Sequence, residues 1–247
     1  MKKALALILA CTFIFALASC GAKKDDPKVK SEGVMTYAEY EAAELDTKVV
    51  VETYVQAKQS YYAEKGTASL YTQDADGAYF LYNAACSQED YDKLTEGAKI
   101  KVTGTKSEWS GEVEIIDATI ELLDGKYVAE TLDATALLGT EDLVKHQNQK
   151  VAFKGLTVEA SADADGNEAP FLYNWNGSGA QGDDLYFTVS VNGNSYKFTV
   201  ESYLCGADTD VYKAVEGLKV GDVIDAEGFL YWYEGVNPHI TSVTVNG

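Results

Sequence analysis

Hydrophobic and polar residues alternate in short runs over most of the chain beyond Val49, and turn residues separate the runs. Because successive side chains of a strand point to opposite faces, this alternation indicates β-strands with one buried face. In the first half of the chain the pattern predicts five strands, the first beginning at Val49 and the others covering 68–72, 78–83, 98–109 and 112–122. An N-cap pattern at Ser87 and a glycine at Gly97 predict one short helix between the third and fourth strands.

The second half of the chain repeats the first. At an offset of 124 residues, about 23 residues align without a gap. The aligned pairs are glycines and aliphatic residues: Leu94 with Leu218, Gly97 with Gly221, Ile100 with Ile224, Gly104 with Gly228, Gly111 with Gly235 and Ile116 with Ile240. Further upstream the offset is 102, and the difference falls in an acidic, glycine-rich stretch over 163–183, which we interpret as an inserted loop.

The second copy predicts the same elements in the same order. Its strands cover 151–159, 185–191, 195–201, 222–233 and 239–245, with a helix near 210–216. Asn192-Gly193 is a typical hairpin turn between the second and third of these strands. The chain is therefore one module written twice, and each copy contains three strands, one short helix and two strands.

This order of elements, with a glycine in the fourth strand, resembles the OB-fold, a five-stranded Greek-key barrel. The resemblance covers nearly all of 36–247 and implies a mainly β protein with two tandem five-stranded OB-fold-like barrels, each with a short helix between strands 3 and 4. A pair of small β-sandwiches is the alternative architecture. The expected organisation is a signal peptide over 1–19, a tether over 20–34, a first module over 35–125, a connector over 126–146 and a second module over 147–247.

The N-terminus has the pattern of a secretory signal. Two lysines precede an apolar run that is too short to span a membrane, and Leu-Ala-Ser leads into Cys20. This ending resembles the lipobox of bacterial lipoproteins, and the resemblance implies cleavage before Cys20 and attachment of acyl chains to it. We therefore expect a lipid-anchored, extracytoplasmic protein of the cell envelope. Tandem OB-like modules behind a lipobox are similar to a group of bacterial surface lipoproteins.

The charge of the chain restricts its partners. It contains 20 basic residues against 39 acidic ones, for a formal net charge of -19, and every basic residue is lysine. Without arginine the chain lacks the planar group that binds phosphate or guanine with two hydrogen bonds, and its summed field repels polyanions. The composition therefore disfavours nucleic acid as a partner.

Residues typical of catalysis are scarce. The two histidines, His146 and His239, lie in a connector and beside a proline, and neither has the spacing of a zinc site. Nucleases of the staphylococcal type use an OB barrel, but they depend on arginines that this chain lacks. We expect no enzymatic activity and no cofactor. Cys86 and Cys205 fit either a disulfide or two buried thiols.

Aromatic residues at predicted loop tips are the main candidates for ligand binding. Trp109 aligns with Tyr233 at the tip of the fourth strand, where OB proteins place a binding loop, and Tyr173 and Trp175 lie in the insertion between the first two strands of the second module. Strict alternation places Phe229, Tyr231 and Tyr233 on one exposed face, although a bulge at Gly228 would invert it. The candidate ligand-binding residues are thus Trp109, Tyr173, Trp175, Tyr231 and Tyr233. Alternatively, these rings pack the modules together or fill the core.

Two acidic loops are compatible with a cation. Asp163 and Asp165 flank a glycine turn in the insertion and form a weak calcium candidate, without the glutamate that completes an EF-hand loop. The similar Asp74-Ala-Asp76-Gly77 sequence is better interpreted as a hairpin turn. No other metal site is indicated.

The sequence favours a non-catalytic binding or adhesion module for an extracellular ligand, a glycan or a peptide. Flat rings beside amides and carboxylates suit the apolar faces and hydroxyls of a sugar, and they also suit a peptide. The alternatives are an OB protein that binds single-stranded nucleic acid by base stacking, and a structural protein of envelope assembly. The pattern leaves the ligand, the oligomeric state and the type of envelope open.

Overall fold

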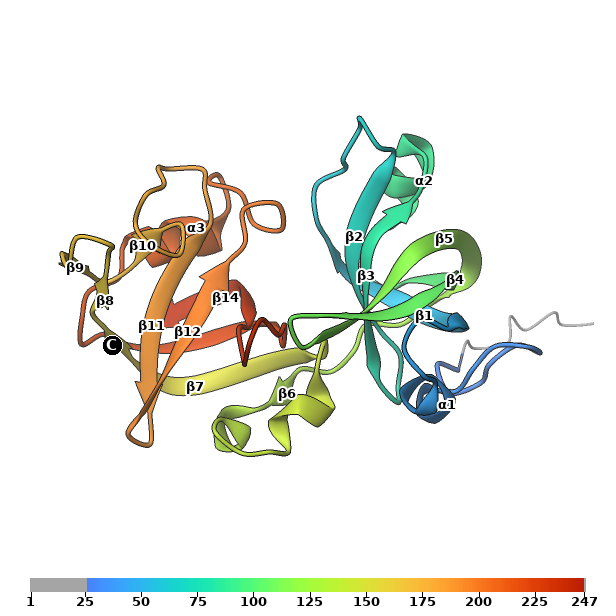
Figure 1. The fold of residues 1–247 in the computed structure, drawn as a ribbon, viewed down its shortest axis with the longest axis horizontal. Helices are drawn as coiled ribbons and strands as arrows, with labels where there is room; N and C mark the ends of the chain where they lie inside the picture. Colours follow the sequence, from blue (N-terminus) through green and yellow to red (C-terminus); the bar gives the residue numbers. More distant parts are fainter. Residues whose placement is uncertain (1–25, 247) are drawn as a thin grey trace, which may run out of the picture.

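The computed structural model describes residues 26–246, and two β-barrels lie side by side in it (Figure 1). Cys20 and the predicted signal peptide lie outside the described residues. No helix in the described part of the chain is long and apolar enough to cross a lipid bilayer.

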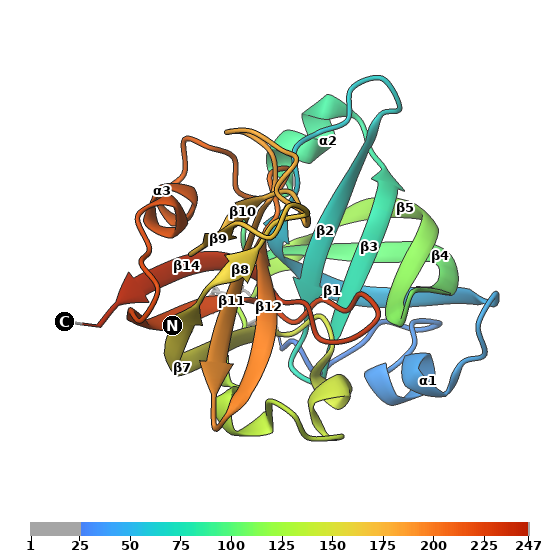
Figure 2. The ribbon, with the colours of Figure 1, turned by 60° about the vertical axis from the view of Figure 1, so that its left-hand side comes forward.

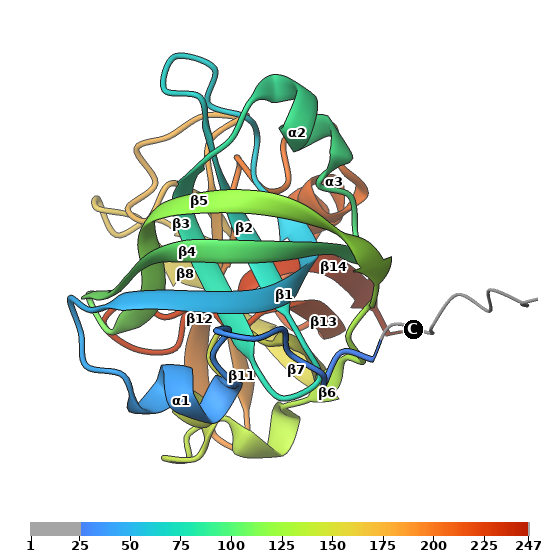
Figure 3. The ribbon, with the colours of Figure 1, turned by 90° about the vertical axis from the view of Figure 1, so that its right-hand side faces the viewer.

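The first barrel is closed by five strands in the order β1, β2, β3, β5, β4. Strands β1, β4 and β5 run beside one another on the face shown in Figure 3. The strands are β1 (Lys48–Lys58), β2 (Thr67–Gln73), β3 (Ala78–Ala85), β4 (Ala98–Trp109) and β5 (Glu112–Lys126). Helix α2 (Gln88–Lys93) lies between β3 and β4, and Ser87 caps it as its sequence predicts. Helix α1 (Tyr37–Ala42) precedes β1 and begins with a capping box at Thr36.

The second barrel has the same topology. Its strands are β7 (Lys150–Glu159), β11 (Leu185–Val191), β12 (Asn194–Val200), β13 (Val223–Phe229) and β14 (His239–Val245), with helix α3 (Asp210–Glu216) between β12 and β13. Strand β7 pairs with both β11 and β13, which closes the barrel. The predicted fold, two tandem five-stranded barrels with a short helix between strands 3 and 4, is therefore confirmed, and the alternative of two β-sandwiches is wrong.

Short elements connect and extend the barrels. Between them lie β6 (Leu132–Asp133), η1 (Thr135–Leu137) and η2 (Leu143–His146). Strand β6 pairs in parallel with β7, and Leu143 is buried in the core of the second barrel. The insertion between β7 and β11 contains β8 (Ser161–Ala162), β9 (Glu168–Ala169) and β10 (Leu172–Tyr173).

The duplicated glycines of the fourth strands mark a close approach between strands. A Cβ atom on Gly104 would lie 2.8 Å from the Ile116 carbonyl oxygen, and one on Gly228 would lie 2.1 Å from the His239 carbonyl oxygen. The register of each strand pair shifts near its glycine, so a bulge lies at the same place in both barrels. Barrel closure thus requires glycine twice, which is the physical reason for this part of the repeat.

The bulge also corrects one prediction about the last aromatic residues. Strand β13 ends at Phe229, so Tyr231 and Tyr233 lie in the loop that follows it and do not continue the alternation of the strand. Phe229 is only 3% exposed and packs with Tyr71 and Phe80 of the first barrel. The predicted exposed stripe is therefore wrong for Phe229, because the bulge at Gly228 turns its ring into the contact between the barrels.

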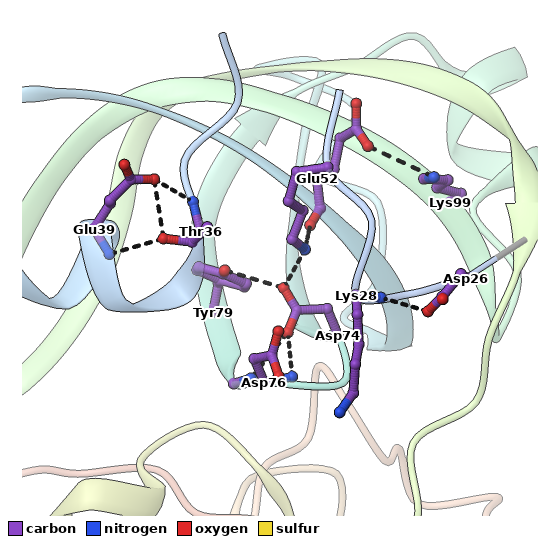
Figure 4. A network of polar contacts seen from close by, with 11 residues as sticks. Asp26, Lys28, Thr36, Glu39, Glu52, Asp74, Asp76, Tyr79 and Lys99 are labelled. Atoms are coloured by element: carbon purple, nitrogen blue, oxygen red, sulfur yellow. Dashed lines mark hydrogen bonds and ion pairs between the residues drawn. The ribbon is translucent and has the colours of Figure 1, made fainter. Parts of the chain in front are cut away.

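The segment before α1 is attached to the first barrel. The Lys30 ammonium lies 2.6 Å from Asp74 Oδ2, and both side chains are almost fully buried. Asp74 Oδ1 accepts the backbone N–H groups of Asp76 and Gly77, and Tyr79 donates its hydroxyl to Oδ2 (Figure 4). Asp74 is therefore the centre of a hairpin turn, as its sequence predicts, and part of the predicted tether packs against this turn.

Candidate ligand-binding groove between the barrels

The tip of the β4–β5 hairpin in the first barrel contacts the tip of the β13–β14 hairpin in the second. Trp109 and Tyr233, which are equivalent in the repeat, contact each other with ring centroids 5.2 Å apart. The Glu234 backbone N–H donates to the Ser110 carbonyl oxygen at 2.7 Å. Positive φ angles at Ser110 and Glu234 form the tight turns that bring these tips together. The loops that OB proteins use for binding are therefore neighbours at one end of the contact between the barrels.

A cavity of about 640 Å³, which we call the tryptophan pocket, opens beside these tips. Four of the five predicted ligand-binding residues line it: Trp109, Trp175, Tyr231 and Tyr233. The fifth, Tyr173, lies elsewhere, and its hydroxyl donates to Glu216 Oε1 of α3 at 2.6 Å. The structure thus brings together rings that are far apart in sequence, with Asn237 and Lys197 as polar neighbours.

A second cavity of about 570 Å³, which we call the tyrosine pocket, lies on the other side of the same contact. Tyr62, Tyr82 and Tyr203 line it together with amide side chains such as Asn83. The two pockets share three lining residues: Glu201, Tyr231 and His239. We therefore treat them as one feature, the inter-barrel groove. Figure 2 shows the loop after β13, which carries Tyr231, in front of β2 and β3 of the first barrel.

The six most exposed aromatic side chains of residues 26–246 lie in this groove. They are Tyr62, Tyr82 and Tyr203 in the tyrosine pocket, and Trp109, Trp175 and Tyr233 in the tryptophan pocket. Large rings exposed to water are unfavourable unless a ligand or partner covers them, and their concentration in one place marks an interaction site. The groove therefore has the properties of a ligand-binding site.

A stacked set of rings forms the wall between the two pockets. Tyr71 stacks on Phe229 with centroids 4.5 Å apart, and Tyr231 stacks on His239 at 4.2 Å. The Tyr71 hydroxyl lies 2.7 Å from His239 Nδ1. Burial lowers the pKa of His239 to about 3, so this imidazole is neutral near pH 7. The wall is therefore made of stacked rings, and its imidazole is uncharged near pH 7.

Glu201 is the buried acidic group at this wall. Its side chain follows the end of β12, and the residue is only 8% exposed. Oε1 accepts the Tyr203 backbone N–H at 3.3 Å, whereas Oε2 has no hydrogen-bond partner. Burial, followed by the nearby charge of Asp184, raises the pKa of Glu201 to about 7. The groove thus contains a carboxyl group with unused hydrogen-bonding capacity.

In the loop proposed as a calcium candidate, the Asp163 carboxylate accepts hydrogen bonds from within the loop itself. Asp163 Oδ1 accepts the backbone N–H groups of Asp165 and Asn167, and Oδ2 accepts the Asn167 side-chain amide. Within residues 26–246, no three histidine, cysteine or acidic side chains are placed to hold a metal ion. These hydrogen bonds explain the Asp163 carboxylate as part of a turn.

The two described cysteines are free thiols, so the chain does not form the disulfide considered for them. Cys205 is buried in the core of the second barrel, and burial raises its pKa to about 11. Cys86 is half-buried, beyond the end of β3.

Sequence reasoning missed Glu201 and the three exposed tyrosines of the tyrosine pocket. Two signals were present in the sequence. Tyr62 follows Tyr61 in the first loop of the first barrel, and Glu201 directly follows the buried residues that end β12. Neither feature identifies a ligand-binding residue from sequence alone, because the pocket forms only where the two barrels contact each other.

No family model matches the chain, and no curated protein matches it either. Several solved structures are similar to it at low TM-scores. A murine DNA-binding protein bound to double-stranded DNA is 11% identical, with 80% of this chain and 96% of that chain covered and a TM-score of 0.37. The p204 HINb domain is 10% identical, with 79% and 95% covered and a TM-score of 0.34. A deletion mutant of the single-stranded DNA-binding protein from Thermus aquaticus is 14% identical, with 81% and 93% covered and a TM-score of 0.24. These similarities assign no ligand to this chain.

Proposed function

We propose that the protein is a non-catalytic binding module that holds a glycan in the inter-barrel groove. The observation that supports this most is the concentration of the six most exposed aromatic side chains of residues 26–246 in the two joined pockets. The lipobox resemblance at Cys20 supports an extracytoplasmic location, in which acyl chains on Cys20 hold the protein at the cell envelope.

The chemistry of the groove suits a sugar. Indole and phenol rings can pack against the C–H faces of a pyranose, while amide and carboxyl groups exchange hydrogen bonds with its hydroxyls. Trp109 and Trp175 supply exposed ring faces, and Glu201, Asn83 and Asn237 supply polar atoms around them. Rings and polar groups occur in both pockets, so an oligosaccharide of several units can contact both barrels.

A peptide fits the fold less well. Peptides commonly bind by adding a strand to a free sheet edge. Both five-stranded barrels are closed here, so their strands already have partners on both sides. A peptide in the groove would therefore bind through its side chains alone, without main-chain pairing to the barrels.

Single-stranded nucleic acid is the second candidate, because exposed rings can stack on bases. The charge opposes it. Lys65 and Lys197 are the lysines that line the groove, against Asp184, Glu201 and Glu234, and the whole chain has a net charge of -19. Phosphates would approach a negative surface, and any such binding should strengthen as salt is lowered.

Substitution of the two tryptophans tests the proposal. Trp109 and Trp175 are 55% and 67% exposed, so alanine at either position should leave stability nearly unchanged. A glycan found by screening the purified protein should bind at least about tenfold more weakly to each variant, since each loses one stacking surface. Tyr173→Phe is the matched control, because Tyr173 contacts Glu216 away from the groove, and it should keep full affinity.

Two results would contradict the proposal. Unchanged glycan affinity in both tryptophan variants would place the binding surface elsewhere. Binding of an oligonucleotide at low salt, with quenching of tryptophan fluorescence and no glycan binding, would favour the nucleic-acid alternative.

A further inference from the structure

Two buried carboxylates of the first barrel, Asp74 and Glu52, have lysine partners, whereas the buried Glu112 and Glu114 have none within residues 26–246 and line neither pocket of the groove. Asp74 pairs with Lys30 at 2.6 Å, and Glu52 pairs with Lys99 at 3.5 Å, as Figure 4 shows for Glu52. Glu201 is comparably buried, yet none of the ion pairs among residues 26–246 includes it. Because Glu201 lines both pockets, its missing partner can come from a bound ligand.

We propose that the glycan carries a cationic amine and that Glu201 binds this ammonium group where the two pockets meet. This inference rests on the proposed function and specifies its ligand class as an amino sugar. The unpartnered Oε2 atom of Glu201 accepts the ammonium N–H. A charge-assisted hydrogen bond in a buried site is stronger than one between neutral groups, so this contact discriminates between charged and neutral sugars.

The surroundings of Glu201 favour a cation. Tyr231 presents an aromatic ring at the same wall, and ring faces attract ammonium groups. Asp184 and Glu234 add negative charge to the tryptophan pocket. Lys197 and Lys65 line the outer parts of the groove, where their side chains are exposed.

Binding of an ammonium should displace a proton from Glu201. Since burial raises the pKa of Glu201 to about 7, the carboxyl is mostly protonated at pH 6, and only the ionised form pairs with a cation. His239 is neutral at this pH, because its pKa is lowered to about 3. The titratable groups that face Glu201 are Asp184, Cys205, Tyr71, Tyr186, Tyr231 and His239.

The test compares two sugars that differ only in their amines. A β-1,4-linked glucosamine tetramer and its fully N-acetylated counterpart are titrated calorimetrically into the purified protein at about pH 6, in two buffers of different ionisation enthalpy. The glucosamine tetramer should bind about tenfold more tightly and release most of one proton, whereas the acetylated tetramer should release none. This proton release is measured on the unaltered protein and does not depend on the folding of a variant.

Two variants locate the contact. Glu201→Gln should lose both the preference for the amine and the proton release, while its affinity for the acetylated tetramer changes by less than about twofold. Glu227→Gln is the matched control. It removes an exposed carboxylate of β13 that lines neither pocket, and it should keep both effects.

Other outcomes overturn the inference in distinguishable ways. Equal affinities without proton release would exclude the ammonium contact and leave the glycan site intact. Tighter binding of tetralysine than of the glucosamine tetramer would assign the amine to a peptide and contradict the sugar. If neither sugar binds and the tryptophan variants behave as the unaltered protein, the proposed function itself fails.

Discussion

Two buried carboxyl groups of this protein differ in their surroundings. Asp74 is part of a network that stabilises the fold, whereas Glu201 has an oxygen atom that is available to a ligand. Asp74 accepts four hydrogen bonds, from Lys30, Tyr79 and the backbone of its own turn. Glu201 accepts the Tyr203 backbone N–H through Oε1, and its Oε2 atom has no hydrogen-bond partner beside the two cavities. Buried polar groups are normally satisfied, so an exception at a cavity points to function, whereas a complete network points to stability.

Removing the Asp74 carboxylate should have the largest effect. Asp74→Ala leaves the buried Lys30 ammonium without its partner and should lower the free energy of unfolding by about 3–5 kcal/mol. Urea denaturation measures the loss. Asp76→Ala, in the same turn but with an exposed side chain, should change stability by less than about 0.5 kcal/mol and serves as the control. Equal losses of stability in the two variants would contradict a stabilising role of the buried Asp74 carboxylate.

Neutralising Glu201 should have the opposite sign. Burial raises its pKa from the usual 4.5 to about 7 in the folded protein, so its ionisation destabilises the fold as pH rises through this range. Glu201→Gln removes this penalty. The variant should match the protein near pH 4 and be more stable above pH 7 by up to about 3 kcal/mol, the equivalent of the pKa shift.

Denaturation at a series of pH values checks this prediction. A stability difference that is constant with pH, or a loss of stability at pH 8, would show that Glu201 has a partner in the folded protein. The comparison with Asp74 would then lose its basis.

The smallest effect on stability concerns the tyrosine pocket. Tyr203 is 67% exposed, so Tyr203→Ala should change the free energy of unfolding by less than about 0.5 kcal/mol. If both pockets hold one ligand, the variant should bind a tetrasaccharide about fivefold more weakly and a disaccharide in the tryptophan pocket unchanged. If Tyr203→Ala weakens binding of both sugars equally, or of neither, the two pockets do not hold one continuous ligand.

Local chemistry explains how much of the fold is predictable from sequence. Ser87 caps α2, the Asp74 turn joins β2 to β3, and the duplicated Gly104 and Gly228 allow each barrel to close. Each of these depends on neighbours in sequence or on a backbone approach that recurs in both copies. The sequence repeat is therefore enough to predict the two-barrel architecture, and the alternation of apolar and polar residues predicts most of the strands.

The site was only partly predictable, because it depends on the docking of one barrel against the other. Trp109 and Tyr233 were found through their equivalence at the strand tips. Glu201 was not predicted, because a single acidic residue after a strand is common in sequences. Only the folded structure places it beside Tyr231 and His239 in the groove. Phe229 was misplaced because a bulge of one residue exchanges the two faces of a strand, and alternation alone does not reveal it.

Amide hydrogen exchange with and without the glucosamine tetramer tests the central claim most directly, because it reports where the ligand lies. We expect slower exchange in both barrels at once, around Ser60 to Tyr62, around Glu201 to Tyr203 and in the loop from Tyr231 to Asn237, with no change in the Asp74 turn. Protection confined to one barrel, or centred on a surface outside the groove, would contradict it.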